Sequence, residues 1–202
     1  MAEETMRLNA IILDRKPFRE NDLLVTIYSK ERGREQLIAR GARKFRSKIA
    51  AHVEPFCLIE GLLIVGKNKN YLGSAISTNV FAYLKRDLAA LSSAASAFKV
   101  FERFIKENQA DEQLYDLVVD FLTTINQPGV NFAFLSLGFK WKMCAILGFA
   151  IAPEHLTKNP EYANVLKLLN ESTFEKIVNI PAVDLDKLDK LVQININQGG
   201  GK

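Results

Sequence analysis

The hydrophobic pattern of this 202-residue chain changes near residue 80. Before that point, apolar residues alternate with polar ones or come in short runs, and both patterns are typical of β-strands. The strand-like segments are 7–13, 22–29, 34–40, 53–66 and 71–77. After that point, apolar residues recur every three or four positions, which is the period of an amphipathic α-helix. Strands followed by helices, rather than alternating with them, predict an α+β chain.

The strand-rich part is expected to close into a small barrel. Five short strands with no helix required between most of them fit the OB-fold, the best-known five-stranded barrel of this size. Gly61 lies in the middle of the longest segment, 53–66. A glycine there permits the bend or bulge with which a strand turns a barrel corner.

The helical part carries its own boundary signals. One apolar face runs from Leu84 to Ile105, and a second runs from Leu114 to Ile125 before the turn Gln127-Pro128-Gly129. Segment 131–149 is apolar nearly all round, so it is expected to be the central helix of a bundle. Asn159 before Pro160 and Asp184 before an apolar run are typical helix starts. The predicted architecture is therefore a five-stranded OB-fold barrel followed by an all-α helical domain.

The chain divides by charge as well as by pattern. Residues 1–83 hold 14 Lys and Arg against 9 Asp and Glu, although the whole chain carries a net charge of only +4. We predict a nucleic-acid-binding OB domain over 1–80 and a helical domain over 81–193, because the positive surplus lies wholly in the first part. The segment 194–202 ends in Gly-Gly-Gly-Lys and is expected to be a disordered tail.

Cysteines and hydropathy favour a cytosolic protein. Cys57 and Cys144 have no Cys-x-x-Cys spacing, so we expect buried thiols, no disulfide framework and no four-cysteine zinc site. The N-terminus has acids where a signal peptide needs bases. The apolar stretch near 130–152 is interrupted by Ser136, Lys140 and Lys142, which indicates a buried helix rather than a membrane span.

The most informative segment for function is Lys30–His52. Its second half, Ala-Arg-Gly-Ala-Arg-Lys-Phe-Arg-Ser-Lys, combines bases with a Gly hinge and one aromatic residue. Arginine and lysine neutralise phosphates, and an aromatic side chain among them can stack on an exposed base. A solvated basic loop is the alternative interpretation. The predicted DNA-binding residues in this segment are Arg34, Arg40, Arg43, Lys44, Phe45, Arg46 and Lys48.

Two weaker clusters add candidates. Lys67, Lys69 and Tyr71 lie in and after the turn Gly-Lys-Asn-Lys-Asn and extend the predicted DNA-binding set, although two lysines in a turn are often merely solvated. Lys140, Trp141 and Lys142 lie on an aromatic-rich helix. This helix is either an ordinary bundle core or the edge of a groove for a short acidic-aromatic peptide.

Catalytic motifs are missing from the sequence. His52 and His155 have no cysteine or paired acids at ligand spacing, which argues against a metal site or a catalytic triad. Neither G-x-x-x-x-G-K-[ST] nor G-x-G-x-x-G occurs, so nucleotide hydrolysis is not expected. We expect no enzymatic activity, no cofactor and no metal.

The order of these features resembles the RecO family of bacterial recombination mediators. The resemblance is carried by three segments and extends to L-G-F near residue 149. The segments are the opening A-I-I-L-D-R-K-P-F-R-E-N-D-L-L-V-T-I-Y-S-K-E-R-G, then A-R-G-A-R-K-F-R-S-K, and then H-V-E-P-F-C-L-I-E-G. The resemblance is specific over about residues 8–80 and diffuse over 81–150. Many relatives carry four zinc-binding cysteines after the L-G-Y/F position, whereas this chain has none there.

The resemblance implies a DNA repair role without nucleotide hydrolysis. RecO-like proteins bind single- and double-stranded DNA, anneal complementary strands and, with RecR, help load RecA onto DNA coated by single-strand-binding protein, whose acidic tail docks on the helical domain. It also implies a cytoplasmic, nucleoid-associated bacterial protein. An RNA-binding OB module and a protein–protein adaptor with an incidental basic loop remain alternatives from the residues alone.

Overall fold

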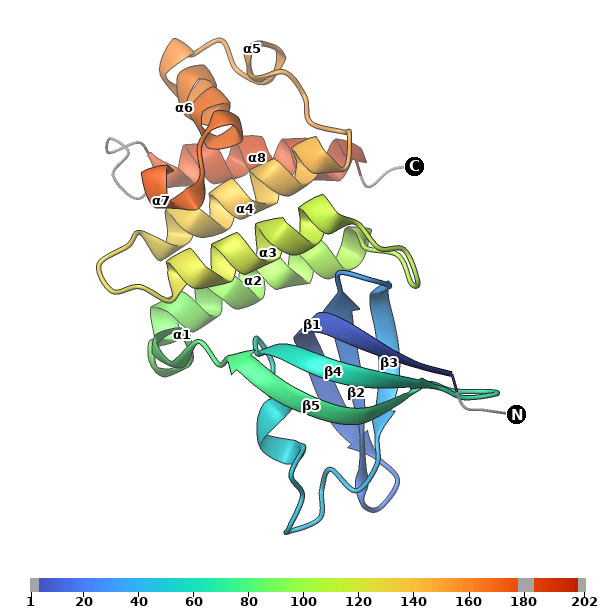
Figure 1. Ribbon diagram of the computed structural model, residues 1–202. Helices are drawn as coiled ribbons and strands as arrows, with labels where there is room; N and C mark the ends of the chain where they lie inside the picture. The colour runs from blue at the N-terminus through green and yellow to red at the C-terminus, as the bar shows by residue number, and fades with distance from the viewer. Residues whose placement is uncertain (1–3, 178–183, 200–202) are drawn as a thin grey trace. The chain divides into compact units, whose positions relative to one another are not determined.

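The computed structural model describes residues 4–177 and 184–199 (Figure 1). The chain forms two compact units. The first, here called the barrel unit, runs to Phe81 and also includes Ile105–Tyr115. The second, the helical unit, contains Ala82–Phe104 and the chain from Asp116 onward.

The barrel unit is a closed five-stranded barrel with the strand order β1-β2-β3-β5-β4. Its strands are β1 (Glu4–Phe18), β2 (Asp22–Ser29), β3 (Gly33–Ala39), β4 (Leu58–Val65) and β5 (Tyr71–Asn79). The long β1 pairs antiparallel with both β2 and β4, whereas β3 meets β5 in parallel through the pair Ile38 and Tyr71. This arrangement confirms the predicted α+β fold with a small five-stranded barrel at its start.

The barrel interior is filled by alternate residues of each strand, as the sequence pattern predicts. The bend or bulge expected at Gly61 lies instead at neighbouring positions of β4. The register between β4 and β5 shifts at Leu58/Ile59 and at Leu62/Leu63, on either side of Gly61. Gly61 instead lets the Leu8 and Leu72 side chains pack closely over its backbone, because a Cβ there would lie only 3.1 Å from Cδ1 of each. The part of the predicted strand before Leu58 forms turns instead.

Segment Ile105–Tyr115 belongs to the barrel unit by its contacts, whereas the sequence pattern placed it in the helical domain. The backbone N–H of Asn108 donates to the Arg34 carbonyl (2.9 Å), and Lys30 Nζ lies 2.6 Å from a Glu112 carboxylate oxygen. Burial and the nearby Asp111 charge raise the pKa of Tyr28 to about 12. Its hydroxyl therefore stays protonated and donates to the Asp111 carbonyl (3.4 Å). Because these bonds join residues far apart in the chain, hydrophobic periodicity carries no sign of them.

At Gly33 the backbone of this segment approaches the barrel closely. Its φ is +73°, and a Cβ there would overlap the Gln109 carbonyl. Gly33→Ala should therefore lower the free energy of unfolding by more than the about 1–2 kcal/mol that a left-handed backbone alone costs an alanine. Gly129→Ala is the matched control, because Gly129 has φ +79° and nothing within 4 Å of the added Cβ. Urea unfolding of both variants checks this; equal losses would contradict the docking of the segment on Gly33.

The helical unit is built around α4 (Phe132–Ile146), which packs against α2 (Leu88–Phe104), α6 (Pro160–Glu171) and α8 (Leu185–Gly199) (Figure 1). The remaining helices are α1 (Ala82–Arg86), α3 (Glu112–Ile125), α5 (Pro153–Leu156) and α7 (Phe174–Ile177). The predicted central helix is thus confirmed. The predicted start of α6 is also correct, because the Asn159 side chain accepts from the backbone N–H of Glu161 (2.9 Å).

The predicted disordered tail at 194–202 is wrong for the residues up to Gly199. Helix α8 continues to Gly199, and Ile196 is fully buried. The Asn195 side-chain oxygen accepts from the backbone N–H of Ile151 (2.7 Å). Leu188, Val192 and Ile196 follow at helical spacing, so the apolar face outweighs the polar composition of the segment. Residues 200–202 lie outside the described part of the chain.

The two cysteines and the apolar helix agree with the sequence analysis. Cys57 and Cys144 are both buried free thiols, and burial raises the pKa of Cys144 to about 11. Among the described residues, no helix combines the length and apolar character that a membrane crossing requires.

Candidate nucleic-acid interface

The basic loop, residues 40–57 between β3 and β4, is fixed where it leaves β3. The backbone N–H of Gly41 donates to the Asp22 carboxylate (2.8 Å), and the backbone N–H of Arg43 donates to the Asn21 carbonyl (2.9 Å). The Arg43 guanidinium donates to the Glu20 carbonyl (3.0 Å). Arg43 thus holds the loop against the turn between β1 and β2.

The far end of the loop is fixed by β1 and β5. The Arg15 guanidinium lies 2.5 Å from the Glu54 carboxylate, and the backbone N–H of Phe56 donates to the Ile12 carbonyl (2.9 Å). His52, at the end of the short 3₁₀ helix η1 (Ala50–His52), accepts at Nδ1 from the backbone N–H of Ser77 (3.1 Å). Both ends of the loop are therefore held by the barrel.

Between these anchors lies the basic tip, Lys44–Lys48. The side chains of Lys44, Arg46 and Lys48 are exposed, and none makes a hydrogen bond or ion pair within residues 4–177 and 184–199. Phe45 is 103% exposed, which is unusual for a phenylalanine in a folded unit. The tip therefore presents unpaired positive charge and an aromatic ring to solvent on a fixed base.

The start of the loop meets the β4–β5 hairpin. The Arg40 guanidinium lies over the Tyr71 ring, 4.1 Å from its centroid. Lys69 Nζ and the Arg19 guanidinium both lie 5.2 Å from the Phe18 ring centroid. Cation–π contacts of this kind hold the cations over aromatic faces while leaving their charge available.

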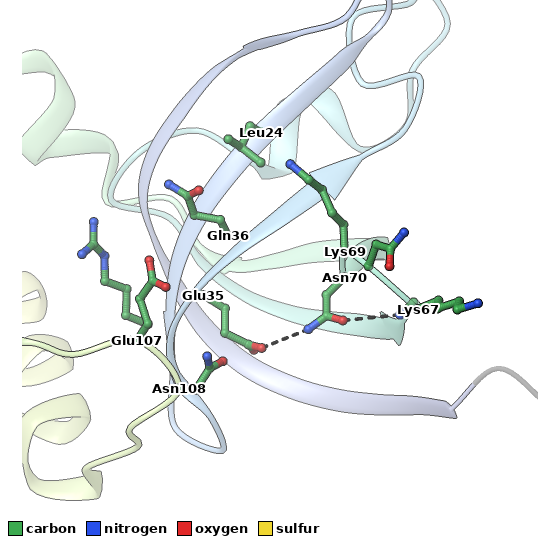
Figure 2. A pocket seen from close by; sticks show the side chains of 11 residues that line it. Leu24, Glu35, Gln36, Lys67, Lys69, Asn70, Glu107 and Asn108 are labelled. Atoms are coloured by element: carbon green, nitrogen blue, oxygen red, sulfur yellow. Dashed lines mark hydrogen bonds between the residues drawn. The ribbon is translucent and has the colours of Figure 1, made fainter.

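The hairpin turn also borders a cavity of about 350 Å³ (Figure 2). Its buried acid, Glu35, accepts from the Asn70 amide (3.2 Å) and from Arg32 Nε (3.0 Å). The backbone carbonyl of Asn70 accepts from the Ile38 N–H (3.0 Å), so Asn70 ties the hairpin to β3. In Figure 2, Lys69 extends towards Leu24 and Lys67 points away from Glu35.

The structure brings predicted DNA-binding residues together in two groups. Arg40 and Tyr71 touch, and Lys67 and Lys69 line the same cavity as Arg34. Arg34 has a different role from the tip, because its backbone pairs with Glu107 and Asn108 and its Nε is buried without a hydrogen-bond partner among the described residues. Phe18 and Arg19 lie near Lys69 as well. In the sequence, Phe18 stands beside Arg19, but the nearby acids Glu20 and Asp22 leave little net positive charge there.

For the helix that carries Lys140, Trp141 and Lys142, the structure favours the bundle-core interpretation over a peptide groove edged by Trp141. Trp141 is fully buried, and its indole N–H donates to the Leu166 carbonyl (2.9 Å). Burial lowers the pKa of both lysines; Lys140 Nζ donates to the Ser96 hydroxyl (3.0 Å), and Lys142 Nζ donates to the Ser172 carbonyl (2.5 Å). The three side chains link α4 to α2 and to α6 with its C-terminal cap.

The described residues contain no cluster of side chains that matches a metal site. Across residues 4–177 and 184–199, no three His, Cys, Asp or Glu side chains gather in a way that could hold an ion.

A closed five-stranded barrel with an anchored basic loop and an exposed phenylalanine is an arrangement found in OB domains that bind nucleic acids. The family model described as Recombination protein O N terminal matches residues 1–84, and the model described as Recombination protein O C terminal matches residues 85–158. The chain therefore belongs to the recombination protein O (RecO) family.

Individual relatives agree with this assignment. The chain is 31% identical over 151 residues to the DNA repair protein RecO of Desulforamulus reducens, covering 75% of this chain and 57% of the relative. It is 36% identical over 119 residues to that of Gloeobacter violaceus, covering 59% and 46%, respectively. The DNA repair protein RecO of a Roseiflexus species is 30% identical over 126 residues, covering 62% and 44%. The match thus spans about half the length of these relatives.

Proposed function

We propose that this chain binds single- and double-stranded DNA through the basic face of its barrel unit and acts as a recombination mediator in DNA repair. The observation that carries the proposal is the basic tip, Lys44–Lys48, whose cations are exposed and unpaired within the described residues while both ends of the loop are anchored. Membership of the RecO family, whose relatives above are named DNA repair proteins, supports the role.

The mechanism requires no catalytic residue. The bases of the tip neutralise phosphates and release condensed counterions, and Phe45 stacks on an exposed base. Two strands held with their charge neutralised repel each other less, so complementary sequences can pair. The chain is thus proposed to anneal strands as a non-enzymatic protein without cofactors.

The partners follow from the family. We propose that the chain acts with RecR, that the acidic tail of single-strand-binding protein docks on the helical unit, and that together they help load RecA. The proposed location is the bacterial cytoplasm, in association with the nucleoid. A strand-annealing assay run with and without single-strand-binding protein tests this role, and no acceleration in either case would overturn it.

Salt dependence tests the electrostatic mechanism directly. If five or six bases contact single-stranded phosphates, log K against log salt should slope by roughly −3.5 to −4, about −0.7 for each contact. Titration of a labelled single-stranded oligonucleotide between about 50 and 200 mM salt measures this slope. A slope near zero would contradict phosphate capture.

Stronger competition by RNA than by DNA of equal length would favour an RNA-binding module. No DNA binding near 50 mM salt, together with tight capture of a protein partner, would favour an adaptor.

A further inference from the structure

A small hollow opens beside the basic tip on the outer side of the barrel. It has a volume of about 290 Å³ and is lined by Arg40, Ile49, Ile64, Tyr71, Leu72 and Gly73. Pockets for small organic ligands start at about 300 Å³, so this hollow suits one ring system rather than an extended ligand.

Gly73 lets the Ile64 side chain pack close against β5 at the edge of the hollow. Tyr71 pairs with Ile64 across β4 and β5, and the register shifts between Leu62 and Leu63. Gly73 lies beside that shift, and a Cβ at this position would lie 2.6 Å from Cδ1 of Ile64. Ile64 therefore occupies the place that a side chain at Gly73 would take, and both residues line the hollow beside Tyr71.

The lining of the hollow combines a planar cation, an aromatic ring and aliphatic side chains. The Arg40 guanidinium lies 4.1 Å from the centroid of the Tyr71 ring. Ile49 and Ile64, both partly buried, contribute apolar surface. A flat aromatic group can stack on a tyrosine ring or a guanidinium plane, and it loses little by leaving water for aliphatic neighbours.

The hollow also continues the charged surface. Ile49 follows Lys48 directly, and Arg40 precedes the anchored part of the loop, so the hollow lies between cations that face solvent. A polymer with phosphates along its backbone and flat groups attached to it satisfies both features. Single-stranded DNA has this chemistry, whereas the bases of a duplex are stacked and paired and cannot enter without being extruded.

We propose that this hollow takes one unpaired nucleobase of a bound strand, stacked against Tyr71 and Arg40, and that it thereby favours single-stranded over double-stranded DNA. The proposal rests on the proposed function, because it assumes that the basic tip holds the strand. It adds a second contact for unpaired bases: the cations of the tip bind phosphates of either form, whereas the hollow, like Phe45, contacts only a strand with a free base. During annealing, the base must leave the hollow before it can pair.

The test compares ligands with the same phosphates but different bases. The probes are a thymidine oligonucleotide, an abasic oligonucleotide of equal length and a duplex. Base–aromatic stacking corresponds to about 5- to 150-fold in affinity for each base. The wild-type protein should therefore bind the thymidine strand that much more tightly than the abasic strand. Tyr71→Leu should remove the part of this preference that Phe45 does not supply, and it should change the abasic and duplex affinities much less than the thymidine affinity.

Two further variants isolate the hollow. Gly73→Val keeps Tyr71 but forces the Ile64 side chain to move, and the altered lining should reduce the same preference. Tyr83→Leu, at a half-exposed tyrosine of the helical unit, is the matched control and should change none of the three affinities. Retained abasic and duplex binding in Tyr71→Leu also shows that the barrel remains folded.

The outcomes separate the two proposals. Wild-type binding of the thymidine and abasic strands with equal affinity would overturn the nucleobase hollow and leave phosphate capture standing. Loss of abasic and duplex binding in Tyr71→Leu would also overturn it, because Tyr71 would then act through the shape of the phosphate-binding face. Failure of the wild-type protein to bind any of the three probes would overturn the proposed function itself.

Discussion

Replacing Lys44, Arg46 and Lys48 together with alanine is expected to weaken the binding of single-stranded DNA by about 100-fold at 0.1 M salt. All three side chains are exposed and have no hydrogen bond or ion pair with the rest of the described chain, so their loss costs the fold little. Three lost phosphate contacts make the slope of log K against log salt shallower by about 2. If the affinities of mutant and wild type are equal near 1 M salt, a slope difference of about 2 makes them differ by about 100-fold one decade lower, at 0.1 M.

The matched control removes three positive charges elsewhere. Lys158, Lys176 and Lys190 are exposed residues of the helical unit, and their replacement with alanine changes the net charge by the same amount. This control should bind DNA within about threefold of the wild type, because charges far from bound phosphates are screened by salt. Equal weakening of both triple variants would mean that overall charge, and not the basic tip, determines binding.

Arg43 is left out of this variant because it has a structural contact. Its guanidinium donates to the carbonyls of Arg19 (3.4 Å) and Glu20 (3.0 Å) and so helps to fix the loop. The sequence shows five bases in ten positions, but it does not show which of them are already bonded. That distinction depends on which turn of the barrel lies beside the loop.

The features that the sequence predicted are those with a local signal. Alternating residues in 22–29 and the change of period near residue 80 predicted the barrel and the helices, and the run of bases predicted the exposed tip. These patterns depend only on neighbours along the chain, and the structure agrees with them.

The features that the sequence missed depend on contacts between distant residues. The attachment of Ile105–Tyr115 to the barrel rests on backbone bonds to Arg34 and on the close approach at Gly33. The hollow needs Gly73, Ile64 and Ile49, which come from three different segments. Each of these residues looks ordinary in its own segment, so neither feature has a sequence signature.

Trp141 shows how a local signal can mislead. Flanking lysines suggested that the indole faced a groove, because charged residues usually lie at the surface. In α4, however, Lys140 is only 5% exposed and Lys142 is half-buried, and each finds a polar partner on another segment. Long lysine side chains can run along apolar surface to reach such partners. The charges beside Trp141 therefore did not mark an exposed helix face.

Trp141→Ala is consequently expected to lower the free energy of unfolding of the helical unit by about 3–5 kcal/mol, the usual cost of truncating a large buried aromatic residue. Two effects add: the cavity left among the helices, and the loss of the indole N–H bond to the Leu166 carbonyl. Trp141→Phe should cost less, because the ring refills part of the space although the indole donor is still missing.

Urea unfolding followed by circular dichroism at 222 nm measures both variants, since Trp141 is the single tryptophan and its fluorescence is lost with it. Duplex DNA binding by the same samples provides an independent measurement, because the basic tip belongs to the other unit. A peptide-groove role predicts near wild-type stability for Trp141→Ala with loss of peptide capture. A core role predicts the large loss of stability, with Trp141→Phe between Trp141→Ala and the wild type, because both ring volume and the N–H donor contribute.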